Sequence, residues 1–364
     1  MKILLLGEYS NVHWTLAEGL RTLGHEVTVL SNGDFWKDYP RDIDLVRRPT
    51  KWGGIKYVAH LIKLIPRLRG YDVVQLINPM FLELKANRIF PVYRYIRLCN
   101  RKVFLAAYGM DFYWVHECIT RMPLRYSDFN IGHRIRTGPD AQKEYNDWLG
   151  TEKECLNRFI AKDCDGIIAG LYEYWSCYQP IFPEKTKFIP FPIKPDENTP
   201  KSFPQQDRIR IFIGLSRGRS VYKGTDIMLA AAKDLAAEYP DRIELRIAEG
   251  LPFAEYLRKM EDCDLILDQL YSYTPAMNAL AAMNKGIVCV GGGEPESYEI
   301  IHEKSLRPII NVLPDYDSVY QALKAIVTHP EKLPVLKAQS VAYVRKHHHY
   351  VKVAQEYVKV WLGE

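Results

Sequence analysis

The sequence predicts an α/β fold of two doubly wound domains, and three observations support that prediction. Short apolar runs alternate with helical segments in two separate series along the chain. A proline-rich stretch at residues 190–204 separates the two series and reads as a linker. The length of 364 residues is comfortable for two domains of roughly 150 residues each. We therefore expect an N-terminal domain at 1–190, a second domain at 205–340, and a C-terminal helix at 341–364 that packs back towards the first domain.

The first series begins with a βαβ pattern. Residues 2–6 form an apolar run that is typical of a buried parallel strand. A helix with leucine on one face follows and ends at Gly24, and a second strand occupies 27–30. Because further strands alternate with helical stretches, the pattern predicts a doubly wound sheet. These further strands are expected at 73–77, 103–107 and 166–169.

The second series repeats the pattern after the linker. Residues 211–213 predict a strand, and residues 225–239 predict a helix that Pro240 closes. Ligands of such sheets bind beyond the carboxyl ends of the strands, so two facing domains place a site in the cleft between them. The remaining strands are expected at 243–248, 265–267 and 287–290.

Composition excludes several classes of protein. The chain has 49 basic and 44 acidic residues, and a net charge of +5 does not by itself indicate a nucleic-acid partner. The first residues form too short an apolar run for a signal peptide or a membrane span, so we expect a cytoplasmic protein. The seven cysteines contain no C-x-x-C pair. They favour buried reduced thiols over a disulfide framework or a zinc site.

A cationic loop lies between the predicted strand at 211–213 and the helix that follows it. Free amides and the positive dipole at a helix N-terminus favour an anion, and arginine adds fork-shaped donors for phosphate oxygens. The loop therefore predicts a diphosphate site, with a solvated basic turn as the open alternative. Its glycines and cations are Gly214, Arg217, Gly218, Arg219, Lys223 and Gly224.

Together with this loop, four short motifs occur in order along the chain. They are Gly7-Glu8-Tyr9-Ser10, Gly24-His25-Glu26-Val27-Thr28-Val29, Ala282-Met283-Asn284-Lys285-Gly286 and Gly292-Gly293-Glu294-Pro295-Glu296. The ordered set resembles the retaining glycosyltransferase family 4 group over essentially the whole chain. The resemblance implies a GT-B fold, in which two Rossmann-like domains face a central cleft.

The same resemblance implies an activity. Such a protein moves a hexosyl group, with retention of configuration, from a nucleotide-diphosphate-sugar donor to an acceptor hydroxyl. It implies a growing surface polysaccharide or a lipid-linked glycan as the acceptor. It implies no cofactor and no metal ion.

Roles for individual residues also follow from the resemblance. The loop at 272–278 would add backbone donors to the diphosphate grip. The implied catalytic residues are Asp111, Glu296 and His13. The implied donor-binding residues are Gly214, Arg217, Arg219, Lys223, Gly224, Tyr273, Asn278, Gly292 and Gly293. The implied acceptor-side residues are Gly7, Glu8 and Tyr108.

Structural roles remain open for some of these residues. Asp111 has the residue type of a helix N-cap, and His13 has the position of a residue that packs against the first helix. Gly292 and Gly293 are also the pair expected at a tight turn that needs a positive φ.

Departures from the family pattern leave a second function open. In the family's E-x7-E motif one glutamate lies near the donor sugar and the other holds the nucleotide ribose, and Tyr273 and Ala281 occupy those two places. Tyr108 stands where many members have a histidine before G-x-D. The family's small glycine turn is replaced by residues 274–276. The alternative is a non-catalytic GT-B protein that binds a nucleotide or a glycan. A dinucleotide oxidoreductase is disfavoured, because residues 7–11 lack the G-x-G-x-x-G spacing.

Two basic segments of the first domain suggest a membrane partner. Residues 55–69 and 85–102 interleave cations with apolar side chains, a pattern that can lie in an anionic membrane interface. We therefore expect peripheral contact with the inner face of the cytoplasmic membrane. Ordinary helices with solvated cations are the alternative. The cations are Lys56, Lys63, Arg67, Arg69, Lys85, Arg88, Arg94, Arg97, Arg101 and Lys102.

Three adjacent histidines, 347–349, fall within a helix expected over 341–361. Adjacent side chains on a helix point around its axis rather than converging. The run therefore predicts exposed surface and no metal site.

Overall fold

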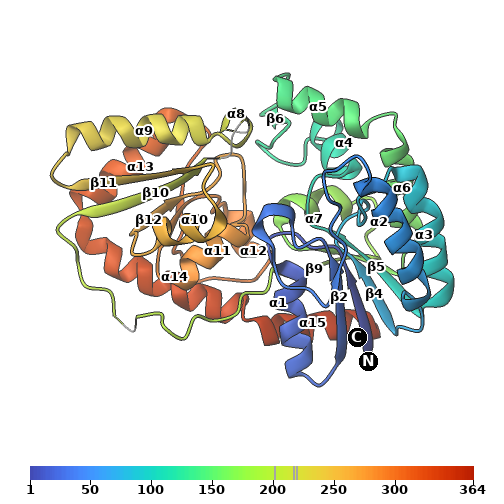
Figure 1. Cartoon of the computed structure of the whole chain (residues 1–364). Coiled ribbons are helices and arrows are strands. Elements are labelled where there is room, and N and C mark those ends of the chain that lie inside the picture. Colours follow the sequence, from blue (N-terminus) through green and yellow to red (C-terminus); the bar gives the residue numbers. More distant parts are fainter. Residues whose placement is uncertain (201, 216–217, 219) are drawn as a thin grey trace.

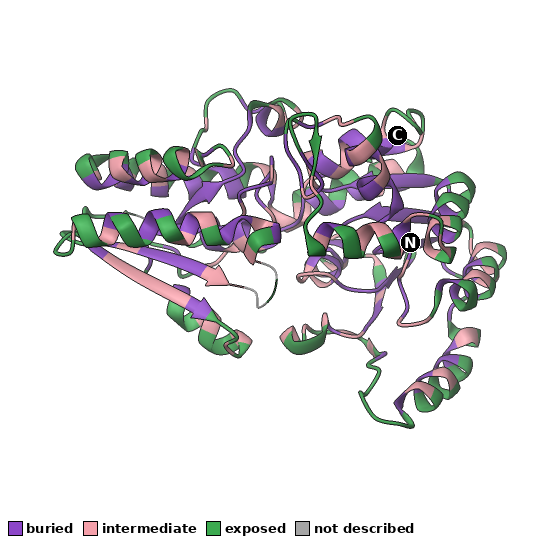
Figure 2. Ribbon diagram, turned by 90° about the horizontal axis from the view of Figure 1, so that it is seen from above, coloured by how far each residue is buried: buried purple, intermediate pink, exposed green. Residues whose placement is uncertain are grey.

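Two parallel sheets organise the chain, one in each half (Figure 1). The computed structural model describes residues 1–200, 202–215, 218 and 220–364. Helices cover both faces of each sheet, and their buried stripes face inwards while their outer faces are exposed (Figure 2). The predicted α/β fold of two doubly wound domains is confirmed.

In the described part of the N-terminal half, seven parallel strands pair in the order β3-β2-β1-β4-β5-β8-β9. Leu4 of β1 is aligned with Thr28 on one side and with Val74 on the other. Ile3 to Leu6 are fully buried, as a continuous apolar run in a central parallel strand requires. The strands are β1 Lys2–Leu6, β2 Glu26–Ser31, β3 Ile43–Asp44, β4 Val73–Leu76, β5 Lys102–Ala107, β8 Gly166–Ala169 and β9 Thr186–Phe188.

The helices of this half connect the strands. They are α1 Val12–Thr22, η1 Phe35–Lys37, α2 Gly53–Leu64, η2 Ile65–Arg67, α3 Ala86–Cys99, α4 Phe112–Thr120, α5 Pro139–Trp148, α6 Glu152–Asp163 and α7 Tyr172–Tyr178. A small antiparallel hairpin, β6 Asn130–Ile131 and β7 Arg134–Ile135, lies between α4 and α5. Each long helix buries an apolar stripe, which is the usual source of helix stability in proteins.

In the C-terminal half, the described residues contribute five parallel strands in the order β11-β10-β12-β13-β14. The strands are β10 Ile209–Leu215, β11 Ile243–Glu249, β12 Leu265–Leu267, β13 Val288–Gly291 and β14 Ile310–Asn311. The helices are α8 Ser220–Lys223, α9 Thr225–Glu238, α10 Phe253–Met260, α11 Met277–Asn284, α12 Pro295–Glu299, α13 Tyr316–Thr328, η3 Pro330–Lys332, α14 Leu333–His347 and α15 Tyr350–Leu362.

The histidine run interrupts the expected C-terminal helix. α14 ends at His347 and α15 begins at Tyr350, so the prediction of one helix over 341–361 is wrong. His348 is buried; its Nδ1 lies 2.9 Å from the carbonyl oxygen of Phe191, and its own carbonyl accepts from Ile193 N–H at 2.6 Å. Burial lowers the pKa of His348 to about 4. The prediction that the run is exposed surface is therefore wrong at this position, because the chain turns there against the linker.

After this break, the last helix lies against the N-terminal half, where α15 runs beside α1 (Figure 1). A Cβ at Gly19 would collide with the carbonyl oxygen of Tyr350, so the two backbones approach closely. Tyr357 is buried, and its hydroxyl bonds that of Tyr108 at the end of β5. The chain therefore crosses between the halves twice.

Candidate functional site

A cavity of about 160 Å³ lies between the two halves. It is found where the strands of both sheets end, since Tyr108 directly follows β5 and Gln269 lies two residues after β12. This is the position at which open α/β sheets bind ligands. The N-terminal half contributes Tyr9, Ser10, Val12, Tyr108, Trp114, Asp128, Leu171, Glu173, Tyr174 and Phe191 to its wall. The C-terminal half contributes Gln269, Tyr271, Ser272, Thr274, Ala276 and Met277.

The carboxylate of Glu173, on α7, crosses from the first half to the second. Its Oε1 accepts from the backbone N–H of Tyr273 at 2.6 Å and from that of Thr274 at 3.0 Å. Burial raises the pKa of Glu173, and the N–H groups oppose that rise. The loop at 272–278 was expected to offer its backbone donors to a diphosphate. At Tyr273 and Thr274 that expectation is wrong, because an internal carboxylate already accepts both hydrogens.

Arg125 forms a second bridge between the halves. Its Nη2 lies 2.7 Å from Glu294 Oε2, and its Nη1 also bonds Glu296. Tyr126 donates its hydroxyl hydrogen to the other oxygen of Glu294. Burial by itself would raise the pKa of Glu296, but Arg125 outweighs it and holds that pKa below the ordinary value. Glu296, implied as catalytic, is thus an ionised partner of an arginine from the opposite half.

Tyr273 is packed into this contact and does not line the cavity. Its hydroxyl accepts from the backbone N–H of Arg125 at 2.7 Å, and the Arg125 guanidinium lies 5.0 Å from its ring centre. The ring also stacks on Tyr172, with centroids 5.9 Å apart. An aromatic side chain that joins the two halves therefore occupies the place of the family's first carboxylate.

The hairpin of β6 and β7 reaches the cationic loop. Arg136 donates from Nη2 to the carbonyl oxygen of Val221 at 2.9 Å, and its guanidinium lies 3.9 Å from the ring centre of Tyr271. Tyr222 donates to Asp128 Oδ2 at 2.7 Å. The sequence offered no signal for Arg125, Arg136 or Glu173, because each acts on a partner about 85 to 170 residues away.

Some of the residues predicted to bind the donor have a described position in the structure, and others do not. Arg217 and Arg219 lie outside the described residues. Lys223 ends α8, and its carbonyl oxygen accepts from Leu270 N–H at 3.0 Å, between the cavity residues Gln269 and Tyr271. Gly224 has φ 72°, which permits the turn from α8 into α9. The cationic loop therefore adjoins the cavity wall.

Two polar side chains, the carboxylate of Asp268 and the amide of Asn278, lie near Lys223. Burial raises the pKa of Asp268, and the positive charge of Lys223 opposes that rise. Asn278 donates to Asp268 Oδ1 at 3.5 Å and accepts from the hydroxyl of Tyr256 at 3.1 Å. A Cβ at Gly214 would touch that same Tyr256 ring. The predicted donor residues Gly214, Lys223 and Asn278 thus gather at one edge of the second sheet.

The paired glycines have a packing role in this structure. A Cβ at Gly292 would collide with Ser272, and one at Gly293 would press on Ile309. Gly293 N–H donates to Asn311 Oδ1 at 3.1 Å. Close packing of the turn after β13 explains both glycines.

His13 and Glu8 lie at the start of α1. Glu8 accepts from the N–H groups of His13 and Trp14 at 3.2 and 2.9 Å, and so caps the helix. Burial raises the pKa of Glu8 to about 8 and lowers that of His13 to about 4. His13 Nδ1 lies 2.8 Å from the carbonyl oxygen of Gly7. Neither side chain lines the cavity, although Tyr9 and Ser10 beside them do.

Asp111 caps α4. Its Oδ1 accepts from Trp114 N–H at 2.8 Å, and its Oδ2 accepts from the hydroxyl of Tyr178 at 2.7 Å. The side chain is fully buried, which raises its pKa to about 7. The structure therefore provides the helix-cap role for Asp111, while Tyr108 of the acceptor-side set lines the cavity.

No group of three or more His, Cys, Asp or Glu side chains in residues 1–200, 202–215, 218 and 220–364 is arranged to hold a metal ion. Within the same described ranges, no helix combines the length and the apolar character that a membrane span requires.

Comparison with known proteins places the fold. No protein-family model and no curated protein sequence matches the chain. Among solved structures, it is similar to HepE from Anabaena in complex with UDP-glucose, at 14% identity and a TM-score of 0.62, over 100% of both chains. Sucrose-phosphate synthase from Thermosynechococcus elongatus is similar at 13% identity and a TM-score of 0.62, over 100% of this chain and 99% of that one. UDP-GlcNAc 2-epimerase from Neisseria meningitidis follows at 12% identity and 0.53, over 100% of both chains. The chain has the two-domain GT-B fold that these structures share.

Proposed function

We propose that this protein is a glycosyltransferase that moves a sugar from a nucleotide-diphosphate-sugar donor to an acceptor hydroxyl. The observation that carries the proposal is the junction of the cationic loop with the cavity, where the backbone carbonyl oxygen of Lys223 accepts from Leu270 N–H, between the cavity residues Gln269 and Tyr271. A cation at this position would neutralise the charge that develops on the leaving diphosphate. The similar HepE structures, which contain UDP, glucose or UDP-glucose, support the same ligand class.

Family resemblance extends the proposal to details that the geometry leaves open. It supports a retaining hexosyltransferase related to family 4, acting without cofactor or metal ion in surface polysaccharide or lipid-linked glycan assembly. Arg217 and Arg219 would join Lys223 in the diphosphate grip. The N-terminal half would hold the acceptor.

Titration calorimetry with nucleoside diphosphates tests the proposal. We expect Lys223→Ala to weaken binding more than tenfold, because a hydrogen bond to a charged group is worth roughly 1.5–3 kcal/mol. Lys233→Ala is the matched control, since Lys233 is exposed on the neighbouring helix α9. Equal binding by wild type and Lys223→Ala would remove the role assigned to the loop.

One set of observations favours the non-catalytic alternative. Tyr273 and Ala281 replace two carboxylates, and Glu173 occupies two backbone donors of the loop that follows β12. A GT-B protein that binds a nucleotide or a glycan without turnover would tolerate both changes. Nucleotide binding without hydrolysis or transfer, across a panel of sugar donors and acceptors, would favour this alternative.

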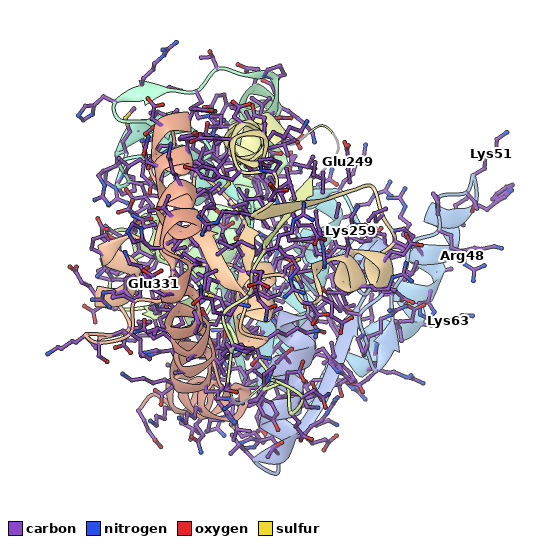
Figure 3. The ribbon with its side chains drawn as sticks, turned by 90° about the vertical axis from the view of Figure 1, so that its left-hand side faces the viewer. Arg48, Lys51, Lys63, Glu249, Lys259 and Glu331 are labelled. Carbon is purple, nitrogen blue, oxygen red and sulfur yellow. The ribbon has the colours of Figure 1, made fainter. Side chains whose placement is uncertain are left out.

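A lipid-linked acceptor would lie in a membrane. One surface of the N-terminal half has the kinds of side chain that bind a membrane surface. We define the α2 surface as the exposed side chains Trp52, Ile55, Lys56, Ile62, Lys63 and Arg67. The exposed fractions of Trp52, Ile55 and Ile62 are 67, 61 and 61%. Figure 3 shows Lys63, with Arg48 and Lys51 from the preceding loop, extending outwards at the edge of the molecule.

Charge supports an anionic bilayer as the partner of the α2 surface. Residues 45–71 contain seven Lys or Arg and no Asp or Glu. Each cation near an anionic surface contributes about 1 kcal/mol, and exposed apolar side chains add insertion. In α3 the contribution is weaker, because Arg97 is paired with Asp163 and Asp165. The proposed location is therefore the inner face of the cytoplasmic membrane, with α2 as the main contact.

A further inference from the structure

Arg136 directs its guanidinium at the main chain of the opposite half. The residue follows β7 in the N-terminal half; its Nη2 donates to the carbonyl oxygen of Val221 at 2.9 Å, and its Nη1 donates to that of Tyr222 at 3.2 Å. Both acceptors belong to α8, the short helix whose last residue is Lys223. Figure 1 shows α8 next to the hairpin that begins with β6. One side chain therefore bonds two consecutive carbonyl groups directly before the cation assigned to the diphosphate.

The hairpin fixes Arg136 from its own side as well. Nη1 lies 3.3 Å from the carbonyl oxygen of Ser127, and the backbone N–H of Arg136 donates to Phe129 O at 2.8 Å. The carbonyl oxygen of Arg136 accepts from the hydroxyl of Tyr145, on α5, at 2.8 Å. Because both the backbone and the guanidinium are held, the position of the hairpin is transmitted to α8.

A second contact from the same region holds α8. Tyr222 is 5% exposed, and its hydroxyl donates to Asp128 Oδ2 at 2.7 Å. Its ring also meets that of Phe129, with centroids 6.5 Å apart. The helix α8 belongs to the C-terminal half by sequence, and the segment around β6 of the N-terminal half provides part of its packing.

On its other side, α8 lies against the cavity wall of its own half. The carbonyl oxygen of Lys223 accepts from Leu270 N–H at 3.0 Å, and a Cβ at Gly224 would collide with Leu270. The Arg136 guanidinium lies 3.9 Å from the ring centre of Tyr271, which lines the cavity. A cation is attracted to the face of an aromatic ring. Arg136 therefore contacts both α8 and the wall against which α8 packs.

We propose that Arg136 is a positioning residue that fixes Lys223 for the diphosphate, so that the N-terminal half sets the affinity of the nucleotide site in the C-terminal half. The inference rests on the proposed function, because Arg136 acts through the cation assigned there. The planar fork of arginine spans two neighbouring acceptors in a fixed geometry, whereas lysine offers a point charge on a flexible stem. A cation that is already held in place loses less freedom when the anion binds, so the anion binds more tightly.

Two variants of Arg136 test the role of the fork. Arg136→Ala removes the fork and the charge, while Arg136→Lys removes the fork alone. Arg134→Ala is the matched control, since Arg134 is an exposed arginine of the same hairpin. We expect titration calorimetry to show UDP bound at least fivefold more weakly by both Arg136 variants than by wild type, and within twofold of wild type by the control.

A double-mutant cycle separates positioning from direct contact with the ligand. If Arg136 acts through Lys223, the double variant Arg136→Ala/Lys223→Ala should bind UDP within twofold of Lys223→Ala alone, because two residues that act as a unit are not additive. Losses that multiply would show that Arg136 touches the ligand or acts elsewhere. That result would overturn the positioning role.

Hydrogen exchange of the backbone amides at 220–224 tests the same role without a ligand. Arg136→Ala should speed exchange there at least fivefold relative to Arg134→Ala, because α8 loses two of its contacts. Unchanged exchange, or wild-type UDP affinity in either Arg136 variant, overturns the proposal. Absence of UDP binding by wild type overturns the proposed function instead, and the exchange result then decides whether Arg136 fixes α8.

Discussion

Arg125 Nη2 and Glu294 Oε2 lie 2.7 Å apart and join the two halves of the molecule across the cleft. The side chain of Glu294 is 6% exposed and that of Arg125 is 55% exposed. The carboxylate is therefore largely desolvated while its partner remains hydrated. Removing the partner would leave Glu294 with the Tyr126 hydroxyl and little water.

We predict that Arg125→Ala destabilises the protein by roughly 1–3 kcal/mol, because a mostly buried carboxylate loses its charged partner. Urea denaturation measures the change. Lys359→Ala is the control, since its pair with Glu356 is exposed on both sides and should contribute below about 0.5 kcal/mol. A similar small effect for both variants would show that the Arg125 bridge does not stabilise the contact between the two halves.

We predict that Ala281→Glu tightens nucleotide binding. Ala281 lies on α11 and is only partly buried, so a longer side chain has room to extend. A glutamate there would restore the carboxylate that the family resemblance assigns to the ribose. Calorimetry with UDP measures the gain. A variant that folds normally and binds no better would mean that the ribose is held elsewhere.

We predict that Asp111→Asn changes how stability depends on pH. Burial raises the pKa of Asp111 to about 7, so between pH 4 and 7 the folded state holds a proton that the unfolded state has released. This proton stabilises the fold at low pH, and its contribution is lost as pH rises through 7. Asparagine keeps an acceptor for Trp114 N–H and cannot ionise.

The stability advantage of wild type over Asp111→Asn should therefore shrink by up to about 4 kcal/mol from pH 4 to pH 7. Denaturation curves at several pH values measure it. Parallel pH profiles for the two proteins would show that Asp111 ionises normally.

We predict that neutralising Lys56, Lys63 and Arg67 to glutamine lowers binding to vesicles containing anionic lipid. Added salt should weaken wild-type binding, because such attraction is screened over roughly 8–10 Å at ordinary ionic strength. UDP binding should be unchanged, since Lys223 lies in the other half.

Neutralising the exposed Lys233, Lys304 and Lys332 of the C-terminal half gives a control with the same loss of charge. Vesicle co-sedimentation that falls equally in both triple variants would reflect net charge alone. It would remove the α2 surface as a membrane contact.

Local patterns in the sequence determined most of the architecture. The apolar run at 2–6 predicts a strand buried on both faces, and β1 is the third of seven strands in the described sheet. The spacing of apolar side chains along a strand or a helix depends only on residues that are close in the sequence. It can therefore be recognised before the tertiary structure is known. The edge of the second sheet at which Lys223 lies also follows from the order of strands and helices.

The histidine run shows where local pattern was insufficient. Residues 341–361 have helical periodicity, yet His348 lies between two helices and bonds Phe191 and Ile193 of the linker. A long-range contact of this kind outweighs the small differences in local helix propensity.

The candidate site depends on the tertiary structure more than the strands and helices do. Residue types alone could suggest Lys223 as a phosphate ligand and Asp111 as a helix cap, because both roles arise from the nearby backbone. Glu173 meets Tyr273 only because two sheets, each folded from its own half, face each other. The charge and hydration of a carboxylate depend on the groups packed around it, and for Glu173 those groups come from a segment 100 residues away.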